Sequence, residues 1–474
     1  MTIRLYDSRA QALRDFEPRV AGEVGIYVCG PTVQSSPHIG HLRSAVAFDV
    51  MRRWFEHRGS RVTLVRNVTD IDDKILANAT PDLPWWALAY AVEREFTAGY
   101  DALGVLPPSY EPRATASIPQ MQELIETLIE RGHAYAADDG SGDVYFAVTT
   151  WAGYGELTHQ KLDDMADSPD APTRGKRDPR DFALWKGAKP EEPADAQFPS
   201  PWGPGRPGWH IECSAMSKRY LGPEFDIHGG GIDLRFPHHE NELAQSAAAG
   251  DAFARYWVHN GSVNVQGQKM SKSLGNSVFA HQALELFDPY VLRYYMVRTH
   301  YRSTLDYLPE EVAKASKAVA RIDETFELAT ALLGDVNLPS PSEEVGSRFA
   351  EAMDDDFNTA AAISIVSRRS RDIRNRAAHG LATKDEVFLE LGKIRGMLSV
   401  LGLDPWSEHW RKTRRPAGRD WRSLLDQVVG YLMRQRETAR SDKNYARADE
   451  IRNELLEYGV RIDDTSEGPV WSPK

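Results

Sequence analysis

Two strand-like stretches flank one helical stretch between residues 25 and 68, and this order constrains the fold more than any other feature of the sequence. Residues 25–29, GIYVC, and 61–68, RVTLVRNV, are short and rich in β-branched and aromatic side chains. Between them, apolar side chains recur at every fourth position, at Leu42, Val46, Val50 and Trp54. A strand, a helix and a second strand in close succession are typical of a βαβ unit, whose strands are parallel. The first half of the chain is therefore predicted to be α/β.

The length of the chain excludes a protein with a single core. Its 474 residues exceed what one hydrophobic core holds, so several domains are expected. The contents of 41% hydrophobic and 27% charged residues are typical of a globular protein, and no window approaches a bilayer-spanning apolar run. The N-terminus also lacks the apolar core of a signal peptide, so we expect a cytoplasmic protein without a membrane partner.

The cysteine count and the net charge limit which cellular compartment and which kinds of partner are expected. Two cysteines make no disulfide framework, which fits a reducing compartment and leaves both thiols free for chemistry or packing. A net charge of −12 argues against a protein that coats itself with nucleic acid indiscriminately, although it allows a local basic face.

The later parts of the chain show a change from mixed to helical patterns. Residues 105–210 read as an insertion, partly loop, with a hairpin signal at 138–146, DDGSGDVYF. Strand signals return at 225–231 and 256–265, and amphipathic helical spacing runs from Pro309 to about Leu403. The basic stretch 405–421 is interpreted as a linker or exposed loop, and a last small helical unit begins near Leu424.

Residues 37–41, PHIGH, place two histidines where the first helix begins. A helix N-terminus at the carboxyl edge of a parallel sheet is a favourable place for an anion. His38 and His41 are three residues apart, so both imidazoles point to nearly the same side and can donate to phosphate oxygens. Gly40 allows a nucleotide to approach closely. The alternative is that both histidines lie on an ordinary surface turn.

Residues 267–276, GQKMSKSLGN, form a second polar motif. Lys269 and Lys272 lie on a glycine-flanked stretch without apolar periodicity. Mobile cations on such a loop can stabilise a phosphate whose charge grows during a displacement, although a solvated run of charges would look similar. With both HIGH and KMSKS present, the chain resembles the class I aminoacyl-tRNA synthetases. This resemblance implies a Rossmann catalytic domain that joins an amino acid to ATP and then to tRNA.

Four side chains form a candidate metal set, namely Cys29, Cys213, His238 and Glu242. His238 and Glu242 are four residues apart on an expected helix, which is the spacing of helical metal sites. Two thiolates, an imidazole and a carboxylate suit zinc. The alternatives are that the cysteines are small buried residues and that the HHENE stretch is a solvated helix face.

Longer stretches resemble the cysteinyl-tRNA synthetase family over almost the whole chain, among them YVCGPTV, VRNVTDIDDKI, GWHIECSAMS and the C-terminal ARADEIRNELLEYGVRIDDT. The implied fold is α/β, with a Rossmann-type parallel-sheet catalytic domain, an inserted connective segment, an α-helical bundle and a small C-terminal anticodon-binding domain. The implied boundaries are 1–110 and 209–265 for the two halves of the catalytic domain, 111–208 for the insertion, 266–308 for the KMSKS loop and stem-contact region, 309–404 for the bundle, and 405–474 for the linker and anticodon-binding domain.

The same resemblance implies roles for individual residues. Cys29, Cys213, His238 and Glu242 would bind one zinc ion per chain, which selects the thiol of L-cysteine. Catalysis and ATP binding would involve His38, Gly40, His41, Gly230, Gly231, Lys269 and Lys272, with Mg²⁺ bound to the ATP. The amino acid would contact Cys29, Gly30, Thr69, Trp209 and Asp233.

The C-terminal segment is the candidate partner of tRNA-Cys. Residues 434–452 carry six basic and four acidic side chains, a basic stripe in an acidic protein, although a charged surface helix would look the same. The resemblance implies an anticodon-reading domain, in which the candidate contacts are Arg440, Asp449, Arg452, Asp464 and Trp471. We expect a monomer.

Two other functions are weighed against this one. The paralogous cysteine ligase of actinobacterial thiol (mycothiol) biosynthesis shares the catalytic chemistry but lacks the anticodon domain, so residues 420–474 count against it. A zinc hydrolase could use Cys29, Cys213 and His238, and the HGGG of 228–231 is similar to an esterase oxyanion loop. The chain has no G-x-S-x-G, and a hydrolase has no use for KMSKS.

Overall fold

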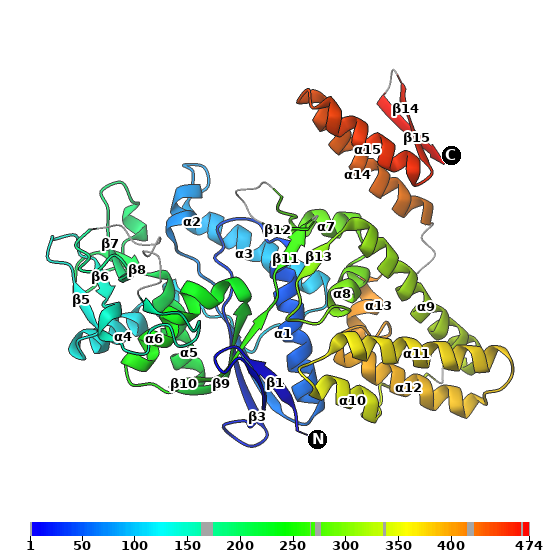
Figure 1. The fold of residues 1–474 in the computed structure, drawn as a ribbon, viewed down its shortest axis with the longest axis horizontal. Coiled ribbons are helices and arrows are strands. Elements are labelled where there is room, and N and C mark those ends of the chain that lie inside the picture. The colour runs from blue at the N-terminus through cyan, green and yellow to red at the C-terminus, as the bar shows by residue number, and fades with distance from the viewer. Residues whose placement is uncertain are drawn as a thin grey trace.

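A four-stranded parallel sheet lies at the centre of the protein (Figure 1). The computed structural model describes residues 2–162, 174–265, 267–270, 276–334, 338–414, 421–465 and 468–473. The strand order is β10–β9–β3–β4, with all pairs parallel. The strands are β3 (Glu23–Val28), β4 (Arg61–Arg66), β9 (Glu224–Gly231) and β10 (Phe253–Asn260).

The predicted βαβ unit is confirmed. Helix α1 (Ile39–His57) connects β3 to β4, and its predicted apolar positions are buried against the sheet and the neighbouring helices. Helices α5 (Trp209–Leu221) and α6 (Glu240–Ala248) lie on the other side of the sheet from α1 (Figure 1). The carboxyl ends of the strands therefore meet between helices at one edge, where α/β proteins bind ligands.

The insertion between β4 and β9 contains more regular secondary structure than the partly looped segment that was predicted. Its centre is an antiparallel sheet of order β5–β6–β7–β8, and the expected hairpin joins β5 to β6. Strand β8 is an edge strand, where its terminal proline is tolerated. The elements between β4 and α5 are α2 (Asp73–Asn78), α3 (Trp85–Ala102), α4 (Ile118–Glu130), β5 (Ala134–Ala136), β6 (Val144–Phe146), β7 (Phe182–Gly187) and β8 (Gly205–Pro207).

The strand signal of residues 256–265 becomes two strands instead of one. Gly261 lies between them, where a Cβ would lie 2.5 Å from the carbonyl oxygen of Ser303 and a side chain has no room. The second strand joins a small sheet of order β12–β11–β13. The remaining elements of this body are β1 (Arg4–Asp7), β2 (Ala12–Asp15), β11 (Val263–Val265), β12 (Gln268–Lys269), β13 (Leu305–Tyr307), α7 (Ala280–Leu286) and α8 (Pro289–Val297).

A helical bundle follows, as predicted from Pro309 onward. It contains α9 (Pro309–Leu333), α10 (Ser347–Asp354), α11 (Thr359–Ala378) and α12 (Lys384–Val400). The interpretation of 405–421 as a linker or exposed loop is wrong for its central part, because Glu408–Thr413 form helix α13. Ser407 caps this helix, and the indole of Trp410 is buried, with Nε1 donating to the Gly402 carbonyl oxygen at 2.9 Å.

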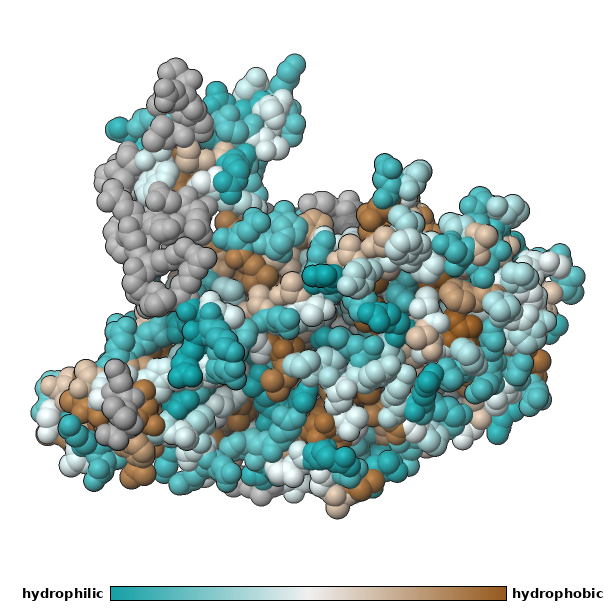
Figure 2. Space-filling view, turned by 180° about the vertical axis from the view of Figure 1, so that it is seen from behind, coloured by the Kyte–Doolittle hydropathy of each residue, from teal (hydrophilic) through white to brown (hydrophobic). Residues whose placement is uncertain are grey.

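The C-terminal unit has a core of its own. Helices α14 (Trp421–Ser441) and α15 (Tyr445–Glu457) pack with the antiparallel strands β14 (Val460–Thr465) and β15 (Gly468–Pro473). Their hydrophobic core contains Val429, Met433, Ile451, Leu455, Val460 and Ile462. The unit projects from the body beside α7 (Figure 1), and from behind it stands out as a separate lobe whose coloured residues are mainly hydrophilic (Figure 2). Within the described ranges, no helix combines the length and the apolar content needed to cross a bilayer.

Candidate active site and metal centre

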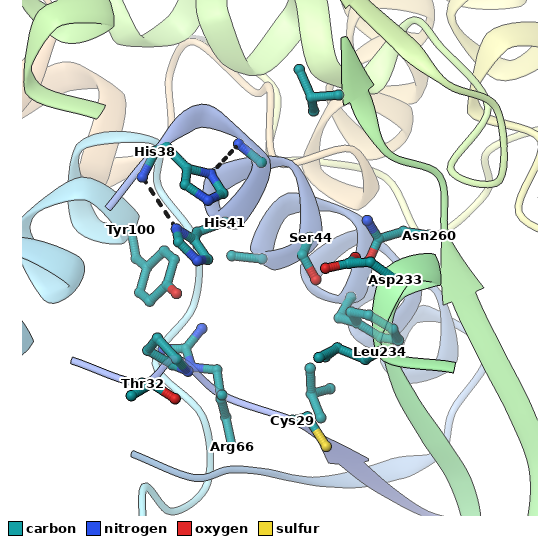
Figure 3. Close-up of a pocket in the computed structure, with 18 of the residues that line it drawn as sticks. Cys29, Thr32, His38, His41, Ser44, Arg66, Tyr100, Asp233, Leu234 and Asn260 are labelled. Atoms are coloured by element: carbon teal, nitrogen blue, oxygen red, sulfur yellow. Dashed lines mark hydrogen bonds between the residues drawn. The ribbon is translucent and has the colours of Figure 1, made fainter. Parts of the chain in front are cut away.

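A cavity of about 520 Å³ opens at the carboxyl edge of the parallel sheet (Figure 3). Its wall comes from the end of β3, the first turns of α1, the start of α5 and the turn after β9. Most of the residues predicted to bind nucleotide or amino acid line it, namely Cys29, Gly30, His38, Gly40, His41, Trp209, Gly231 and Asp233. Two basic residues that were not predicted as site residues, Lys186 and Arg66, also line the cavity.

His38 and His41 are held by the backbone of the helix that they begin. The N–H of Gly40 donates to Nδ1 of His38 at 3.1 Å, and the N–H of His38 donates to Nδ1 of His41 at 3.1 Å. A backbone N–H can only donate, so each Nδ1 must be an acceptor and each neutral ring carries its proton on Nε2. The Nε2–H groups of His38 and His41 therefore provide two imidazole donors at the N-terminus of α1.

The segment after the KMSKS stretch is hydrogen-bonded to the residues on either side of His38. The N–H of Ile39 donates to the carbonyl oxygen of Val278 at 3.0 Å, and the N–H of Ala280 donates to that of Pro37 at 2.7 Å. Met270 lines the cavity, and its methyl group would lie 3.3 Å from a Cβ at Gly40. The two motifs, which are far apart in sequence, therefore meet at the start of α1.

The structure describes the backbone of one lysine of this motif and does not describe the other. The backbone of Lys269 lies in β12 and pairs with Asn264 of β11. Lys272 lies outside the described residues.

The predicted glycines each lie where a side chain would collide. A Cβ at Gly30 would be 1.6 Å from the backbone oxygen of Asn67, so β3 and the segment after β4 approach as closely as the backbone allows. A Cβ at Gly231 would be 2.5 Å from Oδ1 of Asp233, and one at Gly230 would be 3.0 Å from the His239 ring. There is therefore little room for a side chain after β3 at Gly30, or at the carboxyl end of β9 at Gly230 and Gly231.

The four candidate metal ligands come together beneath the cavity. Sγ of Cys29 lies 3.6 Å from Sγ of Cys213 and 3.2 Å from Oε1 of Glu242. Nε2 of His238 lies 3.1 Å from the same carboxylate oxygen. All four donor atoms are within 4.8 Å of one another. Two sulfurs bound to a tetrahedral zinc ion at about 2.3 Å would lie about 3.8 Å apart, so the donor set and its spacing fit zinc.

Burial keeps both thiols protonated in the absence of a metal. It raises the pKa of the Cys29 thiol well above its usual range and that of the Cys213 thiol to about 11. A bound metal would instead deprotonate its thiol ligands, so metal binding would release protons and depend on pH. The HHENE stretch is buried, which excludes the alternative of a solvated helix face.

Other histidines and an aromatic ring surround the cluster, and the sequence analysis did not assign the histidines to it. Nδ1 of His210 lies 2.9 Å from Nδ1 of His238, and Nε2 of His228 lies 2.8 Å from Oε2 of Glu242. The ring of Trp209 stacks on that of His238, with centroids 4.1 Å apart. Such contacts orient metal ligands. The sequence signal for His228 was its place in the predicted strand 225–231, and His210 had no such signal.

A second set of donors overlaps the first. Cys29 and Glu242 also lie near His228 and His239, and their donor atoms are within 4.8 Å of one another. The set with both thiols matches zinc better, because zinc favours soft ligands.

Thr69 is buried and is not among the residues that line the cavity. Its hydroxyl donates to the carboxyl group of Glu212. Burial raises the pKa of Glu212 well above its usual range.

The candidate tRNA contacts all lie in the C-terminal unit, away from the cavity. Arg440, Asp449 and Arg452 are exposed on α14 and α15, and Asp464 lies in β14. Trp471 of β15 packs against the unit's hydrophobic core. The basic stripe is not uniformly exposed, because Arg436 is buried.

Comparisons with known proteins agree along the whole chain. Residues 15–317 match the family model described as tRNA synthetases class I (C) catalytic domain, 348–403 match the DALR domain, and 424–471 match the cysteinyl-tRNA ligase anticodon binding domain. Proteins called Cysteine–tRNA ligase from Clavibacter michiganensis subsp. michiganensis and Leifsonia xyli subsp. xyli are each 57% identical to this chain, with 100% of this chain and 99% of the relative covered.

Solved structures share the fold at much lower identity. The methionyl-tRNA synthetase of Mycobacterium tuberculosis in complex with methionyl-adenylate superposes with a TM-score of 0.57 at 16% identity, covering 85% of this chain and 96% of the other. This likeness concerns the fold alone.

Proposed function

Because the chain belongs to the cysteinyl-tRNA synthetase family of class I enzymes, we propose that it activates L-cysteine with ATP and transfers the cysteinyl group to the 3′ end of tRNA-Cys. The observation that carries the proposal is a match to proteins called Cysteine–tRNA ligase over the full length, with the anticodon-binding unit included. That unit also argues against the amino-sugar ligase, which lacks it. A zinc hydrolase would not need the ATP signatures.

The first half-reaction requires charge stabilisation more than proton transfer. The substrate carboxylate forms a bond to the α-phosphorus of ATP while the bond to the leaving pyrophosphate breaks, and the nucleophile is already ionised at pH 7. His38 and His41 would donate through Nε2 to the phosphates, and Lys269 and Lys272 would neutralise the pyrophosphate, with Mg²⁺ bound to the ATP. The tRNA hydroxyl then attacks the carbonyl carbon of the adenylate, and AMP leaves.

The metal cluster is the proposed origin of specificity. Cys29, Cys213, His238 and Glu242 would hold one zinc ion, and their convergence below the cavity supports this assignment. When bound, zinc supplies a soft electrophile that prefers a thiolate to the hydroxyl of serine. A site that demands one polar partner can discriminate by about 10⁴ to 10⁵ without editing.

The remaining contacts are proposed from their positions. Trp209, Gly30 and Asp233 line the cavity and would contact the amino acid, while Gly230 and Gly231 would leave space for the adenosine. Thr69 is buried behind the cavity wall, so it would act by fixing the segment after β4. We further propose that the chain is a cytoplasmic monomer with the domain boundaries given above, and that α14 and α15 present Arg440, Asp449 and Arg452 to the tRNA.

The proposal is tested by ATP–pyrophosphate exchange followed by aminoacylation. We expect exchange that depends on cysteine, is weak with serine, and leads to charging of tRNA-Cys. Exchange without any transfer to tRNA would favour the amino-sugar ligase, and absence of cysteine-dependent exchange would reject both ligase functions.

A further inference from the structure

Asn260 has a buried side-chain amide that the proposed function does not use. It is the last residue of β10, lines the cavity and is only 4% exposed. Nδ2 of its amide donates to the carbonyl oxygen of Gly261 at 3.2 Å. A carbonyl oxygen can only accept a hydrogen bond, so the amide atom beside it must be the NH₂ group. The surroundings therefore fix the orientation of the amide, and its other polar atom is the oxygen Oδ1.

The Oδ1 atom of Asn260 lacks a donor. It is buried, and it has no hydrogen-bond partner among the residues that the structure describes. A buried acceptor without a partner is unfavourable, and an apolar side chain of similar size would avoid this cost. Because Asn260 belongs to the cavity wall, the missing donor is expected to come from what enters the cavity, either water or a substrate.

The strand register places Asn260 beside the glycines that end β9. Asn260 pairs with Gly231 across the two parallel strands. Gly230 and Gly231 are proposed to leave space for the adenosine, and neither has room for a side chain. Figure 3 shows Asn260 apart from His38 and His41, which are proposed to bind the phosphates. The nucleoside part of ATP is therefore expected at Asn260.

The chemistry of an amide oxygen suits a nucleoside better than a phosphate. The oxygen can only accept a hydrogen bond, and phosphate oxygens are acceptors as well. Adenosine carries three neutral donor groups, which are the 2′- and 3′-hydroxyls of the ribose and the 6-amino group of the adenine. A neutral acceptor also binds such a group without placing a negative charge beside the triphosphate, as an aspartate would do.

We propose that Oδ1 of Asn260 accepts a hydrogen bond from the adenosine of ATP, and thereby selects this nucleoside and holds it while the adenylate forms. The donor is a ribose hydroxyl or the 6-amino group. The inference rests on the ATP-dependent activation of the proposed function. It makes Asn260 a substrate-binding residue, which takes no part in the bond changes at phosphorus.

The test compares ATP with three analogues in pyrophosphate exchange by the full chain. The analogues are 2′-deoxyATP, 3′-deoxyATP and purine riboside triphosphate, each of which lacks one of the three donor groups. The measured quantity is kcat/KM for ATP divided by kcat/KM for the analogue. We expect the wild type to favour ATP by about tenfold over the analogue that lacks the bonded group, because this analogue leaves a buried acceptor unpaired.

Variants of Asn260 separate the hydrogen bond from packing. Asn260→Ala removes the acceptor, so its preference for ATP over that analogue should be lost and its preferences over the other two kept. Asn260→Asp keeps an acceptor and should keep the preference, although its charge raises KM for every nucleotide. If Asn260→Ala does not fold, Asn260→Leu replaces it, since leucine has a similar volume and no acceptor. Asn375→Ala, at an exposed position of α11, is the control and should leave all three ratios unchanged.

The outcomes distinguish this inference from the proposed function. Unchanged ratios in Asn260→Ala would overturn the hydrogen bond, because water or the ammonium group of cysteine would then be the partner of Oδ1. An equal fall in all three ratios would overturn it too, since it would indicate a general loss of fit to the nucleotide. In both cases, cysteine-dependent exchange by the wild type would keep the proposed function. A wild-type chain without such exchange would overturn both.

Discussion

The imidazole rings of His38 and His41 are stacked, with centroids 3.7 Å apart and planes 20° from parallel. The edge of Phe96 lies against the second ring at 4.9 Å between centroids, so packing and backbone hydrogen bonds together fix its orientation. Donors held in this way need no reorganisation when the charge on a phosphate grows.

The His41→Ala variant should therefore be impaired in the chemical step. We expect kcat for cysteine-dependent ATP–pyrophosphate exchange to fall by about 10² to 10³, with a small change in KM for cysteine, because removing one preorganised donor has an effect of this size. His281→Ala, an exposed histidine on α7, serves as the control and should retain wild-type exchange. A large rise in KM for cysteine with kcat unchanged would contradict the assignment.

Cys213→Ser should lower zinc content and cysteine activation together. The variant replaces a soft thiolate ligand by a hydroxyl group, and the other three donors are too few for a closed zinc site. Metal analysis and pyrophosphate exchange on the same preparation measure the two effects. Ser217→Ala, on the same helix, removes a hydroxyl that donates to the carbonyl oxygen of Ser214 within α5, and it should change neither. Normal exchange in a zinc-depleted Cys213→Ser protein would exclude zinc as the selector.

The buried ion pair of Asp49 and Arg293 should be important for stability, because it connects α1 to α8. Arg293→Met leaves the Asp49 carboxylate buried with only Arg53 as its cationic partner, and we expect the free energy of unfolding to fall by about 3–5 kcal/mol at pH 7. Lys412→Met, which breaks an exposed pair on α13, should have an effect below about 1 kcal/mol.

The effect of Arg293→Met should depend on pH in a defined direction. Burial alone would raise the pKa of Asp49, but Arg53 and Arg293 outweigh it and hold the pKa below its usual value. Such a carboxyl group contributes its stability above its unfolded pKa of about 3.9, and loses it as the pH falls through the folded value. Melting curves of wild type and variant should therefore converge below about pH 4. A constant difference across this range would contradict the ion-pair explanation.

Arg452→Ala should affect tRNA and leave activation intact. Arg452 is exposed on α15, far from the cavity, so pyrophosphate exchange should be unchanged while KM for tRNA-Cys rises several-fold. If this side chain contacts a phosphate, the slope of the logarithm of the tRNA-binding constant against the logarithm of salt concentration should also decrease by about one. Arg376→Ala, an exposed arginine of the bundle, is the control. Equal effects of both variants would indicate a general loss of charge.

Much of the catalytic body was predictable because its signals are local. Helix α1 repeats its apolar positions over nineteen residues, and β3 and β4 are short stretches rich in β-branched and aromatic side chains. The sheet of the insertion was not predicted, because β5, β6 and β8 have three residues each and are too short for a period to show. Helix α13 was missed for a similar reason, since its single buried tryptophan is surrounded by charged residues.

Part of the candidate site could likewise be predicted from the sequence, and part could not. The ligand types and the spacing of His238 and Glu242 could be recognised in the sequence, and the structure brings them to the two cysteines. The surroundings could not be recognised in this way. His210 and His228 come from α5 and β9, and their closeness to the ligands is a product of the sheet order and of the helices packed on it.

Strand β3 pairs with β4 on one side and with β9 on the other, and β9 begins at Glu224. On the ribosome, β3, α1 and β4 emerge well before β9, with the entire insertion between them. The growing chain therefore carries an open sheet edge until β9 has been made, and an incomplete set of candidate metal ligands until Glu242 has been made. The proposed metal centre is thus completed only after the whole insertion has been made, and a truncated product that stops before this point lacks the last of its candidate ligands.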